Sequence, residues 1–137
     1  MKTFFDSSAF AKRYVEEPGS QAVETLCTAA TELALSVVCI PEIISALNRR
    51  KRERSLSARQ YKAAKESLSS DLRDIAIVNL TPRVLSTCTT ILEASPVRAL
   101  DALHVACAVE WATELFVSSD KRQISAARKA GLRTKFI

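Results

Sequence analysis

The sequence has 137 residues, which suffices for one compact domain over 1–137 and is too short for two. Hydrophobic residues make up 47% and charged residues 26%, as in soluble globular proteins, and two glycines with four prolines exclude long flexible linkers. The formal charge of +5 favours a polyanionic partner without proving one.

The cysteines stand singly in apolar stretches, with no CxxC pair, at Cys27, Cys39, Cys88 and Cys107. This pattern predicts small core residues in a reducing compartment and excludes a zinc knuckle or a disulfide framework. Asp6 interrupts the N-terminal apolar run, and no run reaches the length of a membrane span. We therefore expect a cytoplasmic protein with no membrane association.

Short apolar runs alternate with longer amphipathic ones along the chain. The expected elements are, in chain order, a strand at 3–5, helices at 8–17 and 20–30, a strand at 33–40, helices from 41 into the basic block and at 57–72, a strand at 75–80, helices at 81–94 and 99–113, a strand at 115–118, a helix at 121–130 and an edge strand at 133–137. Strands alternating with helices predict an α/β fold with right-handed crossovers and a parallel sheet of four to five strands covered on both faces.

Local signals set the expected helix ends. Ser20 is a candidate N-cap, Pro41 suits a first helical position, and Ser57 with Gln60 forms a capping box. Gly131 is expected to stop the last helix.

Four acids lie where strands end and helices begin. Asp6 follows the first strand, Glu42 the second and Asp120 the fourth, while Asp101 opens the apolar helix at 99–113. Open parallel sheets place their sites at this edge, so these acids should converge. Each acid alone has a structural explanation, as an N-cap or a first-turn acid that offsets the helix dipole. Asp101 fits that explanation least, because a charge among apolar neighbours needs a metal or a counter-ion such as Arg98.

Gathered carboxylates repel one another unless a hard cation such as Mg²⁺ or Mn²⁺ lies between them. Such a site supports hydrolysis of phosphodiester bonds, because the metal binds phosphate oxygens and lowers the pKa of a bound water. At least one of the four acids is expected to have a raised pKa in the metal-free fold.

Four segments of the chain, in order, resemble the signature blocks of PIN-domain nucleases, and most of all the VapC-type toxins of toxin–antitoxin pairs. They are FFDSSAFAKRYVEEPGS, SVVCIPEIISALNRR, RALDALHVACAVEWA and LFVSSDKRQISAARKAGL. The resemblance implies a three-layer α/β/α sandwich, dependence on Mg²⁺ or Mn²⁺, endonucleolytic cleavage of RNA, and a homodimer inhibited by a small cognate antitoxin.

Carried over by position, the resemblance makes metal-binding catalytic acids of Asp6, Glu42, Asp101 and Asp120. Ser8 and Ser118 match hydroxyl positions that support the first acid, since ligating carboxylates are usually held by hydrogen bonds.

Other residues leave alternatives open. The basic block Arg49, Arg50, Lys51 and Arg52 fits either a solvated helix end or an RNA-binding surface. His104, the one histidine, fits a packed core residue better than a metal ligand, and Trp111 and Tyr14 fit core or interface positions. The competing functions are a non-catalytic module that binds nucleic acid or a protein partner, and a PIN-like nuclease that acts on DNA. A dehalogenase-like phosphatase is excluded because position 8 is serine, and no P-loop or GxGxxG motif is present.

Overall fold

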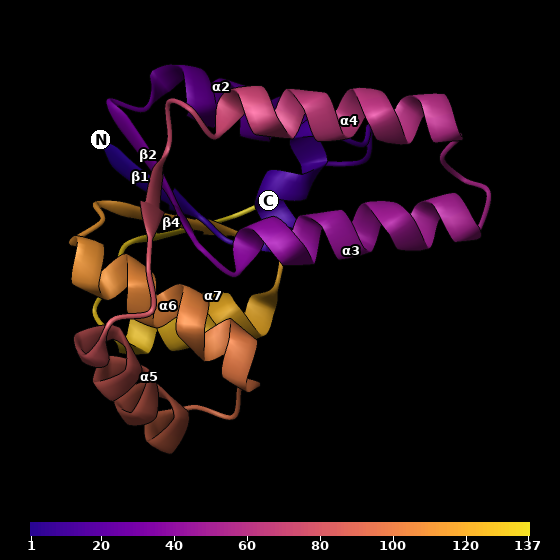
Figure 1. The fold of residues 1–137 in the computed structure, drawn as a ribbon. Coiled ribbons are helices and arrows are strands. Elements are labelled where there is room, and N and C mark those ends of the chain that lie inside the picture. The colour runs from indigo at the N-terminus through magenta and orange to yellow at the C-terminus, as the bar shows by residue number, and fades with distance from the viewer.

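The computed structural model describes residues 1–137, which form a five-stranded parallel sheet between two layers of helices (Figure 1). The elements are, in chain order, β1 (Lys2–Phe5), α1 (Ser7–Phe10), the 3-10 turn η1 (Ala11–Arg13), α2 (Ser20–Ala29), β2 (Glu32–Ser36), α3 (Cys39–Arg52), α4 (Ala58–Asp71), β3 (Ala76–Val78), α5 (Pro82–Ala94), α6 (Ala99–Trp111), β4 (Leu115–Ser118), α7 (Lys121–Lys129) and β5 (Thr134–Phe136). The strand order is β3-β2-β1-β4-β5, and every pair is parallel. The predicted fold class is confirmed.

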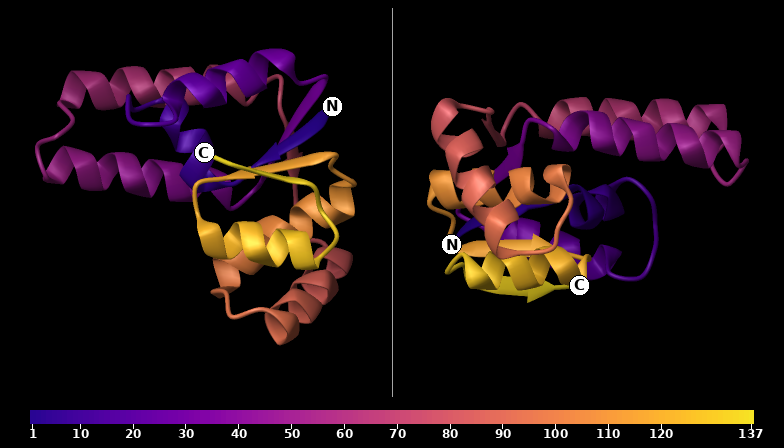
Figure 2. Two further views of the ribbon diagram at one scale, coloured as in Figure 1. Left: turned by 180° about the vertical axis from the view of Figure 1, so that it is seen from behind. Right: turned by 90° about the horizontal axis from the view of Figure 1, so that it is seen from below.

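Successive residues of each central strand face opposite layers. Phe4 lies in register with Phe116, and both belong to a core shared with α5, α6 and α7. Phe5 lies in register with Val117, and both belong to a second core shared with α1 to α4. Figure 1 and the left view of Figure 2 show these two helical layers on opposite faces of the sheet. The central strands are apolar at nearly every position because both of their faces are buried.

Helices α3 and α4 run antiparallel, side by side, and project beyond the sheet as an arm (Figures 1 and 2). Leu47 of α3 and Leu68 of α4 are buried in the same core, and the predicted capping box of Ser57 and Gln60 starts α4. Residues 39–71 contain eight Lys or Arg and four Asp or Glu, so the arm carries a net charge of +4 of the chain's +5.

Three helix boundaries differ from the predictions. The expected helix at 8–17 is the short α1 followed by η1, which ends at Arg13. Gly19, with a φ of 99°, caps α2 in place of Ser20, because a left-handed cap favours glycine. The Ser20 hydroxyl instead accepts from the Glu17 N–H and donates to the Lys12 carbonyl. Helix α3 begins at Cys39, and Pro41 is tolerated there because the first four N–H groups of a helix have no partner within it.

The expected strand at 33–40 is also shorter, because β2 ends at Ser36 and Cys39 and Ile40 already belong to α3. The other predicted elements agree with the structure to within one or two residues. Gly131, with a φ of 91°, follows α7, and α6 is buried along most of its length. Cys39, Cys88 and Cys107 are buried free thiols, and Cys27 is half-buried. None of the helices combines the length and apolar character needed to cross a bilayer.

Candidate active site

Asp6 lies at the carboxyl end of the central strand β1 and is fully buried. Its carboxylate accepts from the Ser118 hydroxyl at 2.6 Å, from the Ser8 hydroxyl at 2.8 Å and from the Ala9 N–H at 2.9 Å. The last bond makes Asp6 the N-cap of α1, so Asp6 also has the structural role that its position between a strand and a helix suggests. However, Asp6 forms no ion pair, and every neighbour that bonds to its carboxylate is a donor. Its surroundings therefore suit a carboxylate that binds a cation.

Ser118 joins the ends of β1 and β4. Its hydroxyl donates to Asp6 and accepts from the Asp120 N–H at 2.9 Å. The Asp120 carboxylate caps α7 by accepting from the Arg122 N–H at 2.9 Å, and it is only partly exposed. Asp6 and Asp120 are thus held in fixed relation, although 112 positions separate Asp6 from the serine that links them.

Glu42 lies in the first turn of α3 and is anchored by two side chains. Ser7 donates to its Oε1 at 2.5 Å, and His104 Nε2 lies 2.5 Å from the same oxygen. Ser7 and His104 are themselves 3.0 Å apart. The His104 ring is 1% exposed, and its Nδ1 has no hydrogen-bond partner. His104 is therefore a core residue, as its sequence context indicates, but one that contacts a predicted metal ligand.

Asp101 lies one turn before His104 on α6 and is half-buried. Its carboxylate accepts from the Gln123 side-chain amide at 3.0 Å. Arg98, the counter-ion considered from the sequence, forms no ion pair with it; the partner is the neutral Gln123 from α7. The Gln123 Oε1 atom is buried with no partner, so a polar acceptor beside Asp101 remains unused.

The pKa values of two acids depart from their ordinary values. Burial raises the pKa of Asp6, although the nearby His104 and the donors around the carboxylate act in the opposite sense. The expected raised pKa is therefore found, but burial causes it rather than repulsion between acids. Burial would also raise the pKa of Glu42, but the hydrogen bonds from His104 and Ser7 outweigh it and lower that pKa.

The four acids share one edge of the sheet but do not form a closed ligand set. No three acidic, histidine or cysteine side chains lie close enough together to hold one metal ion directly. The oxygen donors still fit Mg²⁺ or Mn²⁺, because Mg²⁺ keeps several waters and takes only one or two carboxylates from the protein. The unpaired Asp6 carboxylate and the unused Gln123 oxygen are the observations that favour a cation here.

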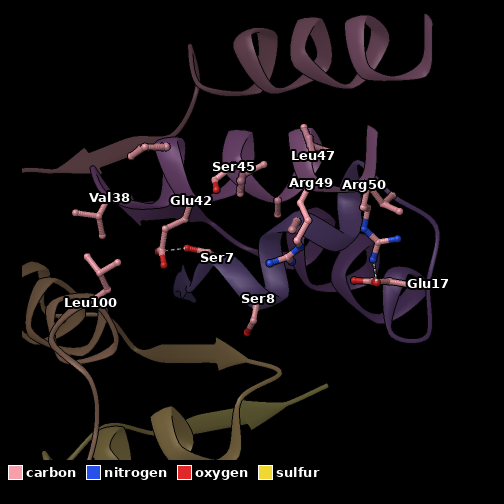
Figure 3. Close-up of a pocket in the computed structure, with 15 residues that line it drawn as sticks. Ser7, Ser8, Glu17, Val38, Glu42, Ser45, Leu47, Arg49, Arg50 and Leu100 are labelled. Carbon is pink, nitrogen blue, oxygen red and sulfur yellow. Dashed lines mark hydrogen bonds and ion pairs between the residues drawn. The ribbon is translucent and has the colours of Figure 1, made fainter. Parts of the chain in front are cut away.

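A groove of about 670 Å³ begins at Ser7, Ser8 and Glu42 and continues along α3 (Figure 3). The predicted basic block does not act as one surface around it. Arg49 lines the groove, and Arg50 lines it while pairing with Glu17 at 2.8 Å. Lys51 lies 4.5 Å from the centre of the Tyr61 ring. Arg52 is exposed in the last turn of α3.

Residues 3–129 match the family described as PIN domain. This chain is a PIN domain.

Solved structures with the same fold include members of toxin–antitoxin systems. VapBC2 from Rickettsia felis, bound to a DNA fragment from its promoter, has a TM-score of 0.71 and 13% identity and covers 100% of this chain and 99% of that chain. VapC20 from Mycobacterium tuberculosis, described as a sarcin–ricin loop cleaving toxin, has a TM-score of 0.69 and 17% identity over 90% of this chain and 94% of that chain. FitAcB from Neisseria gonorrhoeae has a TM-score of 0.71 and 14% identity and covers 98% of this chain and 96% of that chain. At these identities the likeness establishes the shared fold, and comparison with curated proteins finds no sequence match.

Sequence reasoning missed three side chains at the edge of this PIN domain: Ser7, His104 in its contact with Glu42, and Gln123. His104 follows Asp101 by three positions, a spacing that places both on one helix face, and this was the available signal. Ser7 and Gln123 carried no signal, because only the tertiary fold brings them to Glu42 and Asp101.

Proposed function

We propose that this PIN domain is a Mg²⁺- or Mn²⁺-dependent endoribonuclease, the toxin of a toxin–antitoxin pair. The observation that carries the proposal is Asp6, a buried carboxylate without an ion pair at the end of the central strand, linked by Ser118 to Asp120. Burying a carboxylate without an ion pair is costly even when it accepts hydrogen bonds, and a bound cation offsets that cost.

In this proposal Asp6, Glu42, Asp101 and Asp120 hold the metal, directly or through its waters. A metal held there would supply Lewis-acid activation of the phosphodiester and of the attacking water. Ser8 and Ser118 orient Asp6 through hydrogen bonds of 2.8 and 2.6 Å. No histidine is needed as a general base, and His104 is committed to Glu42.

The biological setting is part of the same proposal. The solved structures with this fold include a toxin–antitoxin complex from Klebsiella pneumoniae, and VapC20 is described as a toxin that cleaves the sarcin–ricin loop. For this chain we infer an RNA substrate, a small cognate antitoxin, a homodimeric assembly and a cytoplasmic location.

The test is cleavage of total cellular RNA by the purified protein, free of inhibitor, with Mg²⁺ or Mn²⁺ and with excess EDTA. Cleavage should require the metal. Asp101→Asn and Asp6→Asn should each lower the rate about 100-fold or more while the protein stays folded. Asp74→Asn is the matched control, because Asp74 is an exposed acid between α4 and β3.

Each other outcome contradicts a stated part of the proposal. Full cleavage in EDTA would exclude the metal mechanism. Near-normal rates for both variants would show that the acids are structural. Faster cleavage of single-stranded DNA than of RNA of the same sequence would favour the DNA-directed alternative, and no cleavage of either would favour a binding module.

A further inference from the structure

The largest cavity of the protein is the groove between α1–η1 and α3, which it follows from Pro41 to Arg50, and it opens directly beside Glu42. Ser7 and Ser8 line one wall, and Glu42, Ser45 and Arg49 lie along the other (Figure 3). A polymer with one of its units bound at the acids must run along the protein surface beyond them. The groove begins beside Glu42 and offers such a path.

The charges that line the groove are largely neutralised within the protein. Glu17 pairs with Arg50 at 2.8 Å and with Lys12 at 3.3 Å. Glu42 is held by Ser7 and His104. Arg49 forms no ion pair, and its side chain extends from α3 toward α1 in Figure 3. The groove therefore presents one free cation, a guanidinium.

The spacing of the lining residues fits a chain of phosphates. Glu42, Ser45 and Arg49 fall at positions i, i+3 and i+7 of α3, which lie on one helix face. Seven residues correspond to about 10 Å along a helix axis, so Arg49 lies about two turns along α3 from Glu42. It is placed for the next charged group of the same polymer.

We propose that this groove binds the RNA strand beside the cleavage point and that Arg49 is the residue that holds a flanking phosphate. The inference rests on the proposed ribonuclease function and names a contact for its substrate. A guanidinium presents a planar fork that matches phosphate oxygens in a bidentate manner, and Ser45 adds an exposed hydroxyl on the same face. The remaining members of the basic block are not needed for this contact, because Arg50 is paired and Lys51 lies over Tyr61.

The first test measures binding without cleavage. A fluorescent single-stranded RNA is titrated in EDTA at several salt concentrations against the wild type, Arg49→Gln, Arg49→Lys and Arg59→Gln. Arg59 is the matched control, an exposed arginine on α4 outside the groove. Arg49→Gln should reduce the slope of log K against log salt by about 0.7, the value for one lost single-strand phosphate contact. Arg49→Lys should keep most of the slope, and Arg59→Gln should change affinity less than Arg49→Gln.

The second test locates the contact with oligonucleotides that carry one neutral methylphosphonate linkage at successive positions. Wild-type binding should weaken at one linkage next to the cleavage point, and Arg49→Gln should be insensitive to that same linkage. The proposal would be overturned if Arg49→Gln and Arg59→Gln lost RNA affinity equally. It would also be overturned if every linkage that weakens wild-type binding weakened the binding of Arg49→Gln as well. If Arg49→Gln bound RNA normally but bound the cognate antitoxin more weakly, the groove would be assigned to a protein partner. That result would also overturn the proposal.

Binding in EDTA keeps this inference separable from the proposed function. Arg49-dependent RNA binding without cleavage in Mg²⁺ would refute the nuclease and leave the groove assignment standing. Metal-dependent cleavage by the wild type, together with normal RNA binding by Arg49→Gln, would support the nuclease and refute the groove assignment.

Discussion

Asp6 shows how one residue can be both a structural cap and the centre of a candidate site. It caps α1 through the Ala9 N–H, yet a helix of four residues does not require a fully buried carboxylate as its cap. The two serine hydroxyls that donate to it also accept backbone N–H groups of the loop after β4, Ser8 from Ser119 and Ser118 from Asp120, so they fix the carboxylate against that loop. The arrangement places an acid in a position that costs stability in the metal-free protein.

That cost predicts a dependence on pH. The pKa of Asp6 is raised in the folded protein, so the folded state favours the protonated form. The resulting stability is fully present below the unfolded pKa of about 3.9 and is lost as pH rises through the folded pKa. In EDTA, Asp6→Asn should therefore gain stability relative to the wild type as pH rises from 4 to 7. Thermal melts of both proteins across that range provide the measurement, and a relative loss for Asp6→Asn would contradict the assignment.

At the scale of elements, α6 delivers two groups to the site. Asp101 and His104 lie one turn apart on it, and His104 connects α6 to α3 through Glu42. Because α6 packs against α5, β2 and α7, the positions of both groups are fixed by the core. His104 is in this sense a positioning residue for Glu42.

His104→Ala should lower kcat for RNA cleavage about 10- to 100-fold with little change in KM, as for other groups that orient metal ligands. His104→Gln, which retains a side-chain donor, should recover part of the loss. Val105→Ala is the control, since it removes buried apolar atoms on the same helix without touching Glu42. A structural role alone would lower the melting temperature of both Ala variants and leave the kcat of folded protein unchanged.

The same variants give a readout that is independent of activity. At ten times its dissociation constant, the metal should stabilise the wild type by about 1.4 kcal/mol. This corresponds to roughly 4 °C in melting temperature for a domain of this size. His104→Ala should show a smaller metal-induced rise and Val105→Ala a full one.

The sequence allowed most elements to be predicted but not all of their ends. The capping box of Ser57 and the stop at Gly131 are local signals, and both are found. Ser20 and Pro41 carry equally good local signals, yet α2 begins on Gly19 and α3 begins at Cys39. At these two ends the tertiary packing decides, because the Ser20 hydroxyl bonds to the preceding turn and Cys39 is fully buried.

For the whole molecule, a twofold dimer is the remaining family-based prediction. Obligate dimers bury mostly apolar helix faces. Leu85 and Leu92, two turns apart on α5, are 49% and 41% exposed and give the monomer such a surface. Light scattering of the isolated protein at micromolar concentration should give twice the chain mass of 15.0 kDa, and a monomer mass would contradict the prediction.

The position of the acids at one edge of the sheet was predictable because parallel strands end there, whereas their contacts were not. The alternation of strands and helices indicates a parallel sheet, but it does not say that β1 lies between β2 and β4. Nor does it reveal that Asp6 shares a hydroxyl with Asp120, or that Gln123 replaces Arg98 as the partner of Asp101. Contacts across more than 100 residues depend on register and side-chain direction, and neither has a local sequence signal.

The place of β1 between β2 and β4 also sets when the site can first exist during synthesis. Ser118 and Asp120 are made 112 and 114 positions after Asp6. At roughly 5–20 residues per second, the 114 positions from Asp6 to Asp120 take about 6–23 s to translate. Throughout that interval the nascent chain lacks β4 and holds an incomplete set of acids. On the proposed activity, the growing chain therefore has no complete site until β4 has been made and has paired with β1.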